Sequence, residues 1–541
     1  MLERAYNWFD RVILELGREF RFSYLPPLMV YLAYGVSGLT AIVGTFFVKD
    51  YLGLSAEFLA ALGFWAGIPW ALKMPLGHLV DLIWRHKAGM VYLGACLTAA
   101  SLLVMVGLLA HPDAMATFMP VEAWFVLSTL LAPVGFVVQD VVADAMTVEA
   151  VPLLDKDGHP FPAGTRRLMH TTMQTLGRVA IIGGTVFVAL LNVFMFSGVE
   201  NLDEQAKLQI YIRIYEIALV IPVISVAGVL LSGILKRREF RRLLGHGIDK
   251  VKAGEMVHGQ VERTQPNWWI LGGSLVFVIF TVTMGLAEVP YNQEIIFAGS
   301  MLIVGFLINR LLQVLEPAAR NVLLGTAIII FVYRAMPTPG AGQTWWMIDE
   351  LGFDQQFLSV LSLISSGLAL FGMFIFRRFM AEKSIAYIVV FLTLISTLLT
   401  FPIIGMYYGL HEWTAAHTGG IVDAHFIALV DTAIESPLGQ VAMIPMLAWI
   451  ANSAPVKLKA TFFAVMASFT NLALSASTLG TKYVNQIYTV TREVSDRDTA
   501  VVTVPADYSE LGWLMITVAV LTFILPLAAI GLVKLTRLRS A

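Results

Sequence analysis

The sequence predicts an all-α polytopic membrane protein, and three observations lead to that class. Of its 541 residues, 57% are hydrophobic and 14% are charged, whereas soluble domains average about 25% charged residues. Apolar stretches long enough to cross a bilayer, which takes roughly 20 residues, recur along most of the chain. Basic residues gather in alternate connecting loops, as they do in membrane proteins with a fixed orientation.

Residues 1–27 are expected to lie on the membrane surface as an amphipathic helix. Apolar side chains from Trp8 to Phe20 fall on one helical stripe, and the arginines fall off it. Pro26 and Pro27 end that segment, because proline interrupts a helix. Six predicted spans then form an N-terminal bundle over residues 28–235, at 28–48, 58–83, 88–110, 122–148, 168–196 and 211–235.

A basic loop at 236–267 separates this bundle from the rest of the chain. A tight helical hairpin is predicted next over 268–313, with spans at 268–288 and 293–313. Six more spans form a C-terminal bundle and tail over 319–541, at 319–337, 356–377, 384–408, 425–451, 459–484 and 511–535. The predicted total is therefore fourteen membrane helices.

A short internal repeat supports this division. Tyr51–Leu59 and Glu350–Leu358 share the pattern x-Leu-Gly-apolar-x-x-x-Phe-Leu, and each copy links two apolar spans. The repeat pairs the two six-helix bundles and leaves the hairpin as an insert between them. Transporters are often built from such repeated halves, with the substrate site near the midplane where the halves meet.

Loop charges predict the orientation. With the N terminus inside, the inner loops hold most of the basic residues, for example Lys236, Arg237, Arg238, Arg241 and Arg242. The positive-inside bias then places both termini in the cytoplasm. We expect a multi-pass protein of a cell membrane, most simply a bacterial inner membrane, that is surrounded by lipid and is a monomer.

Charged residues within the spans are the main candidates for function, because each costs about 2.5–3.5 kcal/mol on insertion scales. Lys73 and Asp81 both lie in the predicted second span. The stretch from Gly77 through Asp81 to Arg85 resembles the signature loop of the major facilitator superfamily, in which the glycine allows close helix packing and the aspartate gates. Leu82 and Trp84 stand where that loop usually has a basic residue and a glycine. A simple basic turn is the alternative.

Two carboxylates and a cation mark the fourth and fifth spans. Asp140 and Asp144 share a helix face, as do Gln174 and Arg178, because residues four apart are neighbours on a helix. At 1.5 Å per residue, Asp140 and Arg178 come out about 12–15 Å from the cytoplasmic ends of their helices, and Lys73 about 16 Å. These charges form either a structural ion pair or a site where a cation attracts an anionic substrate and a carboxylate takes a proton.

Several segments together resemble the folate-biopterin transporter family of the major facilitator superfamily. They are Pro69–Gly77 followed by Asp81, Asp140–Met146, Met336–Leu358, and Pro455–Ala464 with Ser468 and Asn471. The resemblance implies a major facilitator fold and proton-linked movement of folates or pterins. Lys73, Asp81, Asp140 and Asp144 match the family's motif positions. The extra hairpin is similar instead to the muropeptide permeases, which have fourteen helices.

We therefore predict a secondary active transporter, by proton symport, of an anionic or polar organic solute. Lys73, Arg178, Gln174 and Asn471 are the candidates for binding substrate; Asp140 and Asp144 for carrying the proton; Gly77, Asp81 and Arg85 for gating. A muropeptide-type permease and a non-transporting assembly factor on the same fold stay open. The sequence has no Walker loop, nucleotide fingerprint or zinc-ligand spacing, so we expect no enzyme activity, cofactor, metal or nucleic-acid partner.

Overall fold

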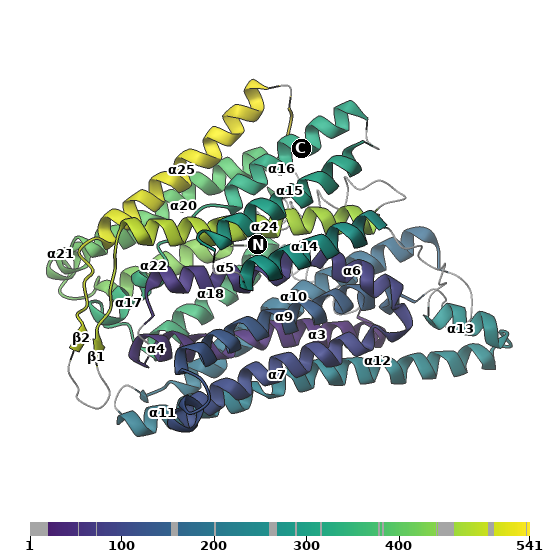
Figure 1. The fold of residues 1–541 in the computed structure, drawn as a ribbon, viewed down its shortest axis with the longest axis horizontal. Coiled ribbons are helices and arrows are strands. Elements are labelled where there is room, and N and C mark those ends of the chain that lie inside the picture. The colour runs from purple at the N-terminus through teal and green to yellow at the C-terminus, as the bar shows by residue number, and fades with distance from the viewer. Residues whose placement is uncertain are drawn as a thin grey trace, which may run out of the picture. The chain divides into compact units, whose positions relative to one another are not determined.

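The computed structural model is almost entirely helical, which confirms the predicted class (Figure 1). It describes residues 20–51, 54–71, 73–152, 161–199, 202–258, 268–286, 289–313, 316–376, 379–380, 383–439, 441, 459–495, 502–536 and 538–540. Within those residues, nine helical stretches are long and apolar enough to cross a membrane. The total of fourteen spans stays a prediction, and most of the expected N-terminal surface helix lies outside the described residues.

The chain divides into two compact units. Unit 1 comprises residues 1–40, 76–191 and 208–267, and unit 2 comprises residues 41–75, 192–207 and 268–541. Two early stretches, 41–75 and 192–207, therefore pack with the later part of the chain and not with the predicted N-terminal bundle.

Unit 1 is a bundle of long helices that lie side by side in Figure 1. Helix α9 packs against α7 and α3, and α12 packs against α3 and α7. Its helices, some of which extend beyond the unit, are η2 (Phe22–Tyr24), α3 (Leu25–Val36), η3 (Ser37–Thr40), α6 (Lys73–Leu82), η4 (Trp84–His86), α7 (Ala88–Ala110), α8 (Pro112–Ala116), α9 (Val121–Ala150), α10 (Ala163–Met195), α11 (Glu204–Ala218), α12 (Val220–Gly245) and α13 (Lys250–His258).

Unit 2 contains the remaining helices and one two-stranded antiparallel sheet, in which Val494 pairs with Val504 and Ser495 with Val502. Helix α24 packs against α5, α15 and α16, and α25 packs against α20 and α16. Its elements are α4 (Ala41–Tyr51), α5 (Ala56–Ala71), α14 (Trp268–Leu286), α15 (Asn292–Leu312), α16 (Pro317–Arg334), α17 (Ala341–Asp349), α18 (Gln355–Ile375), α20 (Ile385–Tyr407), α21 (Leu410–His417), α22 (Ala424–Glu435), η6 (Ser436–Leu438), α24 (Lys459–Ile487), β1 (Val494–Ser495), β2 (Val502–Val504) and α25 (Leu511–Leu535).

The internal repeat corresponds to a shared helix start. Helix α5 begins after Ser55, whose hydroxyl accepts a hydrogen bond from the Phe58 N–H at 3.0 Å. Helix α18 begins after Asp354, whose carboxylate accepts one from the Phe357 N–H at 2.6 Å. A side-chain oxygen that bonds an N–H of the first turn is the usual way to cap a helix. The two copies therefore agree in capping geometry as well as in sequence.

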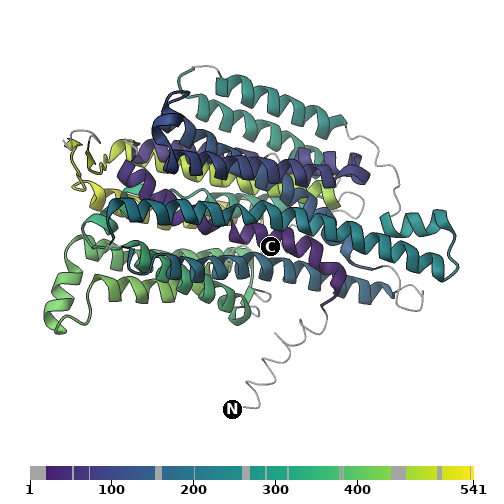
Figure 2. The same cartoon turned by 90° about the horizontal axis from the view of Figure 1, so that it is seen from below.

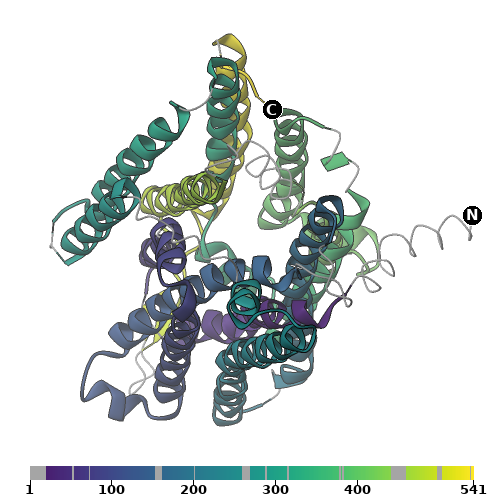
Figure 3. The same ribbon diagram turned by 90° about the vertical axis from the view of Figure 1, so that its right-hand side faces the viewer.

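The predicted hairpin is present as α14 and α15, whose near-antiparallel ribbons are visible in Figure 2 and Figure 3. Polar contacts tie α15 to α24 and α5. The Glu294 carboxylate accepts hydrogen bonds from Lys482 at 3.0 Å and from the Tyr483 hydroxyl at 2.6 Å. The Gln293 amide donates to the Ala61 carbonyl at 3.2 Å. The first turn of α15 thus connects the hairpin to other helices of unit 2, in addition to apolar packing.

Close contact between α7 and α9 depends on two glycines. A Cβ on Gly94 would lie 2.5 Å from the Gly135 carbonyl oxygen, and a Cβ on Gly135 would lie 2.6 Å from the Gly94 carbonyl oxygen. Small residues allow membrane helices to approach closely and gain van der Waals contact. The backbone-to-backbone contact fixes the position of α9, which carries Asp140 and Asp144.

We expect Gly94→Ala to destabilise the chain by about 1–3 kcal/mol, the usual cost of overpacking. The new methyl group would meet a backbone oxygen of α9, which cannot move independently of its helix. Gly89→Ala, on the same helix, is a matched control, since a Cβ at Gly89 would lie within 4 Å of no described atom. The measurement is the melting temperature of both purified variants in detergent. Equal melting temperatures would show that the α7–α9 contact is not this tight.

Candidate functional site

The candidate site in unit 1 begins with the carboxylates of α9. Asp140 and Asp144 lie four residues apart, so their side chains share one face of the helix. Both side chains are half-buried, and the neighbouring residues Val141, Val142 and Ala143 are buried. An apolar environment disfavours a charge that has no partner, so each carboxylate requires a hydrogen-bond donor, a cation or a bound proton.

A tyrosine on α3 supplies a donor. The Tyr31 hydroxyl donates a hydrogen bond to the Asp144 carboxylate at 2.6 Å, and the Tyr31 side chain is only 5% exposed. Hydrogen bonds to a charged acceptor are roughly twice as strong as those between neutral groups. Tyr31 therefore holds the position of the Asp144 side chain between α9 and α3.

Glycines on α3 and α10 make room for this arrangement. A Cβ on Gly35 would lie 2.1 Å from the Ile181 carbonyl oxygen, and a Cβ on Gly184 would lie 2.9 Å from the Gly35 Cα. About two turns before Gly184 on α10, a Cβ on Gly177 would lie 2.9 Å from the Tyr31 ring. The α3–α10 contact is thus close enough for the Tyr31 ring to lie against the α10 backbone, next to Arg178.

Three charged residues lie near Tyr31. The Tyr31 hydroxyl bonds Asp144, and Asp140 lies one turn before Asp144 on the same helix face. Arg178 follows Gly177 on α10, whose backbone lies against the Tyr31 ring. Unit 1 thus places two acids, one cation and a tyrosine in one polar cluster inside an apolar bundle. We call these four residues the Tyr31 cluster.

The other predicted substrate-binding residues are Asn471, Lys73 and Gln174. The Asn471 amide on α24 donates to the Trp70 carbonyl on α5 at 3.0 Å, so it connects two helices of unit 2. Lys73 is half-buried and belongs to unit 2, and its predicted place in one layer with Asp140 and Arg178 stays a prediction. Gln174 lies on α10, and its side chain is outside what the structure describes.

The predicted gating residues lie on or next to α6. A Cβ on Gly77 would meet no described atom within 4 Å, so the close helix approach expected at this glycine is not found among the described residues. Asp81 lies in the same helix and Arg85 in η4, and both side chains are outside the described part. Their gating role stays a prediction.

Sequence reasoning did not single out two residues. Tyr31 was hidden among many apolar residues of its span, although a hydroxyl there needs a partner. Glu149 was also missed: it lies in the last turn of α9 and bonds Lys87 at 2.5 Å and Lys236 at 2.7 Å. A lone acid at a helix end surrounded by basic loops is a signal that could have found it. We call these three residues the Glu149 cluster.

The Glu149 cluster also accounts for Trp84, which departs from the signature loop. The Lys87 ammonium lies 3.6 Å from the centre of the Trp84 ring and is 7% exposed. An aromatic face attracts a cation, most strongly when the pair is desolvated. The Trp84 ring therefore makes a cation–π contact with the same Lys87 ammonium group that binds Glu149.

Solved structures with the same fold are transporters. A POT family transporter in complex with a thioalcohol-conjugated peptide is 11% identical with a TM-score of 0.57, covering 96% of each chain. A POT family transporter in complex with 5-aminolevulinic acid is 12% identical with a TM-score of 0.55, covering 97% of each chain. At these identities the likeness shows the fold alone, and it confirms the predicted major facilitator fold.

Sequence relatives add the family. A folate-biopterin transporter of Synechocystis sp. (strain ATCC 27184 / PCC 6803 / Kazusa) is 23% identical over 461 residues, which cover 85% of this chain and 74% of that protein. The sequence profile of the BT1 family matches residues 34–539. The family and this relative indicate a membrane transporter and not an enzyme, and the chain belongs to the BT1 family.

Proposed function

We propose that the chain is a proton-coupled secondary transporter of an anionic or polar organic solute, such as a folate or a pterin, that works by alternating access. The observation that supports this most is the Tyr31 cluster, which combines two acids with one cation inside an apolar bundle. A purely structural bundle gains little from such groups, because burying them costs free energy. The Synechocystis relative is a folate-biopterin transporter, and this suggests the solute class.

The roles follow from charge. Folates carry carboxylates, so we assign Arg178 and Lys73 to the anionic group of the solute, and Gln174 and Asn471 to its polar edges. Asp140 and Asp144 are the proton carriers. When an anionic solute takes the cation, a carboxylate that has lost that cation is less stable as a charged group and binds a proton. The loaded carrier then moves little net charge across the membrane.

The gate and the setting complete the proposal. Gly77, Asp81 and Arg85 open and close the inner side of the carrier. Both termini face the cytoplasm of a bacterial inner membrane, in line with the loop charges, and the carrier works as a monomer surrounded by lipid.

Uptake by purified protein in liposomes tests the proposal. We expect a folate or a pterin to accumulate, and to accumulate more when the outer solution is the more acidic one. Equal accumulation with and without the pH gradient would rule out proton coupling. Accumulation of a muropeptide instead of folates and pterins would replace the solute class. No accumulation of any of the three would favour a non-transporting role.

Tyr31→Phe should change the pH dependence of this uptake while leaving transport intact. The change removes the donor to Asp144, and hydrogen bonds to charged groups contribute about 1.5–3 kcal/mol. We therefore expect the pH profile of uptake by Tyr31→Phe to differ from that of the unchanged protein. Tyr92→Phe, at an exposed tyrosine of unit 1, is the control. Identical pH profiles for Tyr31→Phe and Tyr92→Phe would exclude Tyr31 from the proton site.

A further inference from the structure

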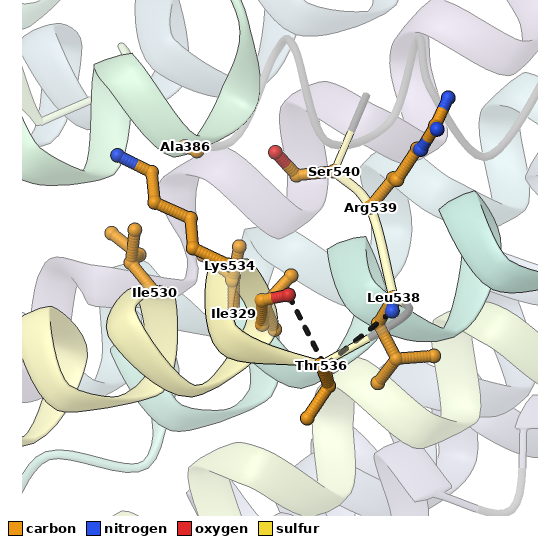
Figure 4. A pocket seen from close by; sticks show the side chains of 9 residues that line it. Ile329, Ala386, Ile530, Lys534, Thr536, Leu538, Arg539 and Ser540 are labelled. Carbon is orange, nitrogen blue, oxygen red and sulfur yellow. Dashed lines mark hydrogen bonds between the residues drawn. The ribbon is translucent and has the colours of Figure 1, made fainter.

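The end of α25 and the tail after it form a cavity that the transport site does not use. The cavity has a volume of about 550 Å³ and lies among α16, α20, α25 and residues 538–540. Its walls combine apolar side chains, such as Ile329, Ile530 and Val533, with the cations Lys534 and Arg539 (Figure 4). None of the described residues that line it is acidic.

Local bonds fix the tail that closes this cavity. The Thr536 hydroxyl donates to the Val533 carbonyl at 3.1 Å and accepts from the Leu538 N–H at 3.4 Å. The Arg539 N–H then donates to the Asn321 carbonyl on α16 at 3.4 Å. Gly325 allows the tail to lie against α16, since a Cβ there would lie 2.2 Å from the Arg539 carbonyl oxygen. The backbone of Arg539 is therefore held beside the cavity.

The cavity lies where a membrane surface would be. Ala386 is in the first turn of α20 and Lys534 is in the last turn of α25, and both helices are apolar and long enough to span a bilayer. Leu535, next to Lys534, is 88% exposed, and Tyr387, next to Ala386, is 52% exposed. Lipid would cover large apolar side chains that are exposed at this end of the helices.

The positive charges at this cavity favour an anionic ligand. Figure 4 shows Lys534 and Arg539 extending on opposite sides of Ser540. The first turn of α20, which contributes Ala386 to the wall, adds the partial positive charge of a helix N terminus. Basic pockets between membrane helices bind anionic lipid head groups. Apolar walls beneath two cations fit a phosphodiester with acyl chains better than they fit a free, fully hydrated anion.

We propose that this cavity binds the head group of an anionic phospholipid, with the phosphate held by Lys534, Arg539 and the Ser540 hydroxyl. This site is separate from the Tyr31 cluster and does not depend on the proposed solute. Each cation near a membrane surface contributes enough attraction to change affinity about fivefold, so removing both should weaken binding about thirtyfold.

Thermal unfolding of the purified protein in a neutral detergent tests this. We expect phosphatidylglycerol to raise the melting temperature, because a ligand of the folded state stabilises it. Phosphatidylcholine, inorganic phosphate and glycerol 3-phosphate should leave it unchanged. Stabilisation by either small phosphate to the same degree would show a free-anion site and overturn the lipid proposal, as would equal stabilisation by phosphatidylcholine.

Substitutions test whether phosphatidylglycerol stabilises the protein by binding at this cavity. Lys534→Gln with Arg539→Gln should keep the melting temperature found without lipid and require about thirtyfold more phosphatidylglycerol for the same rise. Arg213→Gln with Lys252→Gln removes two exposed cations of unit 1 and should respond as the unchanged protein does. Gly325→Leu keeps both charges but displaces the tail, and should also weaken the response. An unchanged response in the Lys534/Arg539 double variant would place the lipid elsewhere and overturn the proposal.

Discussion

Glu149→Ala should destabilise unit 1 by about 3–5 kcal/mol, the usual cost of removing one partner from a buried ion pair. The Glu149 carboxylate is 8% exposed and its two oxygens bind different lysines, Lys87 at 2.5 Å and Lys236 at 2.7 Å. Without the carboxylate, two ammonium groups would face each other. Lys87, at 7% exposed, has little access to water, so most of the cost falls on it.

The same cluster connects three helices. Lys87 precedes α7, Glu149 is in the last turn of α9, and Lys236 is on α12. Asp144 lies only five residues before Glu149 on α9, a rise of about 7.5 Å. Loss of the Glu149 cluster should therefore disturb the helix that carries the proposed proton site, and not only the stability of the bundle.

Matched variants separate these contributions. Lys236→Met should cost much less than Glu149→Ala, because Lys236 is 27% exposed and the Lys87–Glu149 pair remains. Lys87→Met with Glu149→Leu should recover most of the lost stability, since an apolar replacement of a buried pair is often neutral. The readout is the melting temperature in detergent, with a fall of roughly 10 °C expected for Glu149→Ala. A fall no larger than that of Lys236→Met would contradict a buried cluster.

The apolar periodicity and length of each span were enough to predict most of the helices. The predicted spans 88–110 and 511–535 coincide with α7 and α25, because a lipid-facing helix must be apolar over its whole length. The predicted span 28–48 is instead interrupted by the 3₁₀ turn η3 between α3 and α4. Hydropathy does not report such turns, since they change the backbone and not the polarity of the side chains.

The candidate site was harder to predict from the sequence than the fold. Asp140, Asp144 and Arg178 could be singled out because charge is rare in an apolar span. Tyr31 could not, because a tyrosine is common in membrane helices and its partner lies 113 positions away. Gly35, Gly177 and Gly184 determine that contact, and a glycine becomes informative only when the helix that faces it is known.

Asp144→Asn should abolish gradient-driven accumulation of the solute while preserving solute exchange across the membrane. Asparagine resembles the protonated carboxyl group in shape and carries no charge, so the variant would keep position 144 permanently in the equivalent of its protonated form. The Tyr31 hydroxyl, which donates to Asp144 at 2.6 Å, can donate equally to the amide oxygen. We therefore expect the fold and the solute site to survive.

Asp140→Asn tests the second carboxylate in the same way. Asp140 lies one turn before Asp144 on α9 and shares its helix face. If one aspartate carries the proton and the other only balances Arg178, one variant should lose accumulation and the other should mainly weaken solute binding. The pair of variants therefore assigns the two roles.

The measurement compares two assays in liposomes that contain the same amount of protein. Counterflow of labelled solute reports exchange, and uptake driven by an acidic outer solution reports coupling. A fall of at least tenfold in uptake with counterflow preserved would support proton carriage by that aspartate. Glu122→Gln, at an acid in the first turn of the same helix, is the control and should leave both assays unchanged. Full accumulation in both single variants and in the double variant would remove Asp140 and Asp144 from the coupling mechanism, and the half-buried acids would then serve to hold α3, α9 and α10 together.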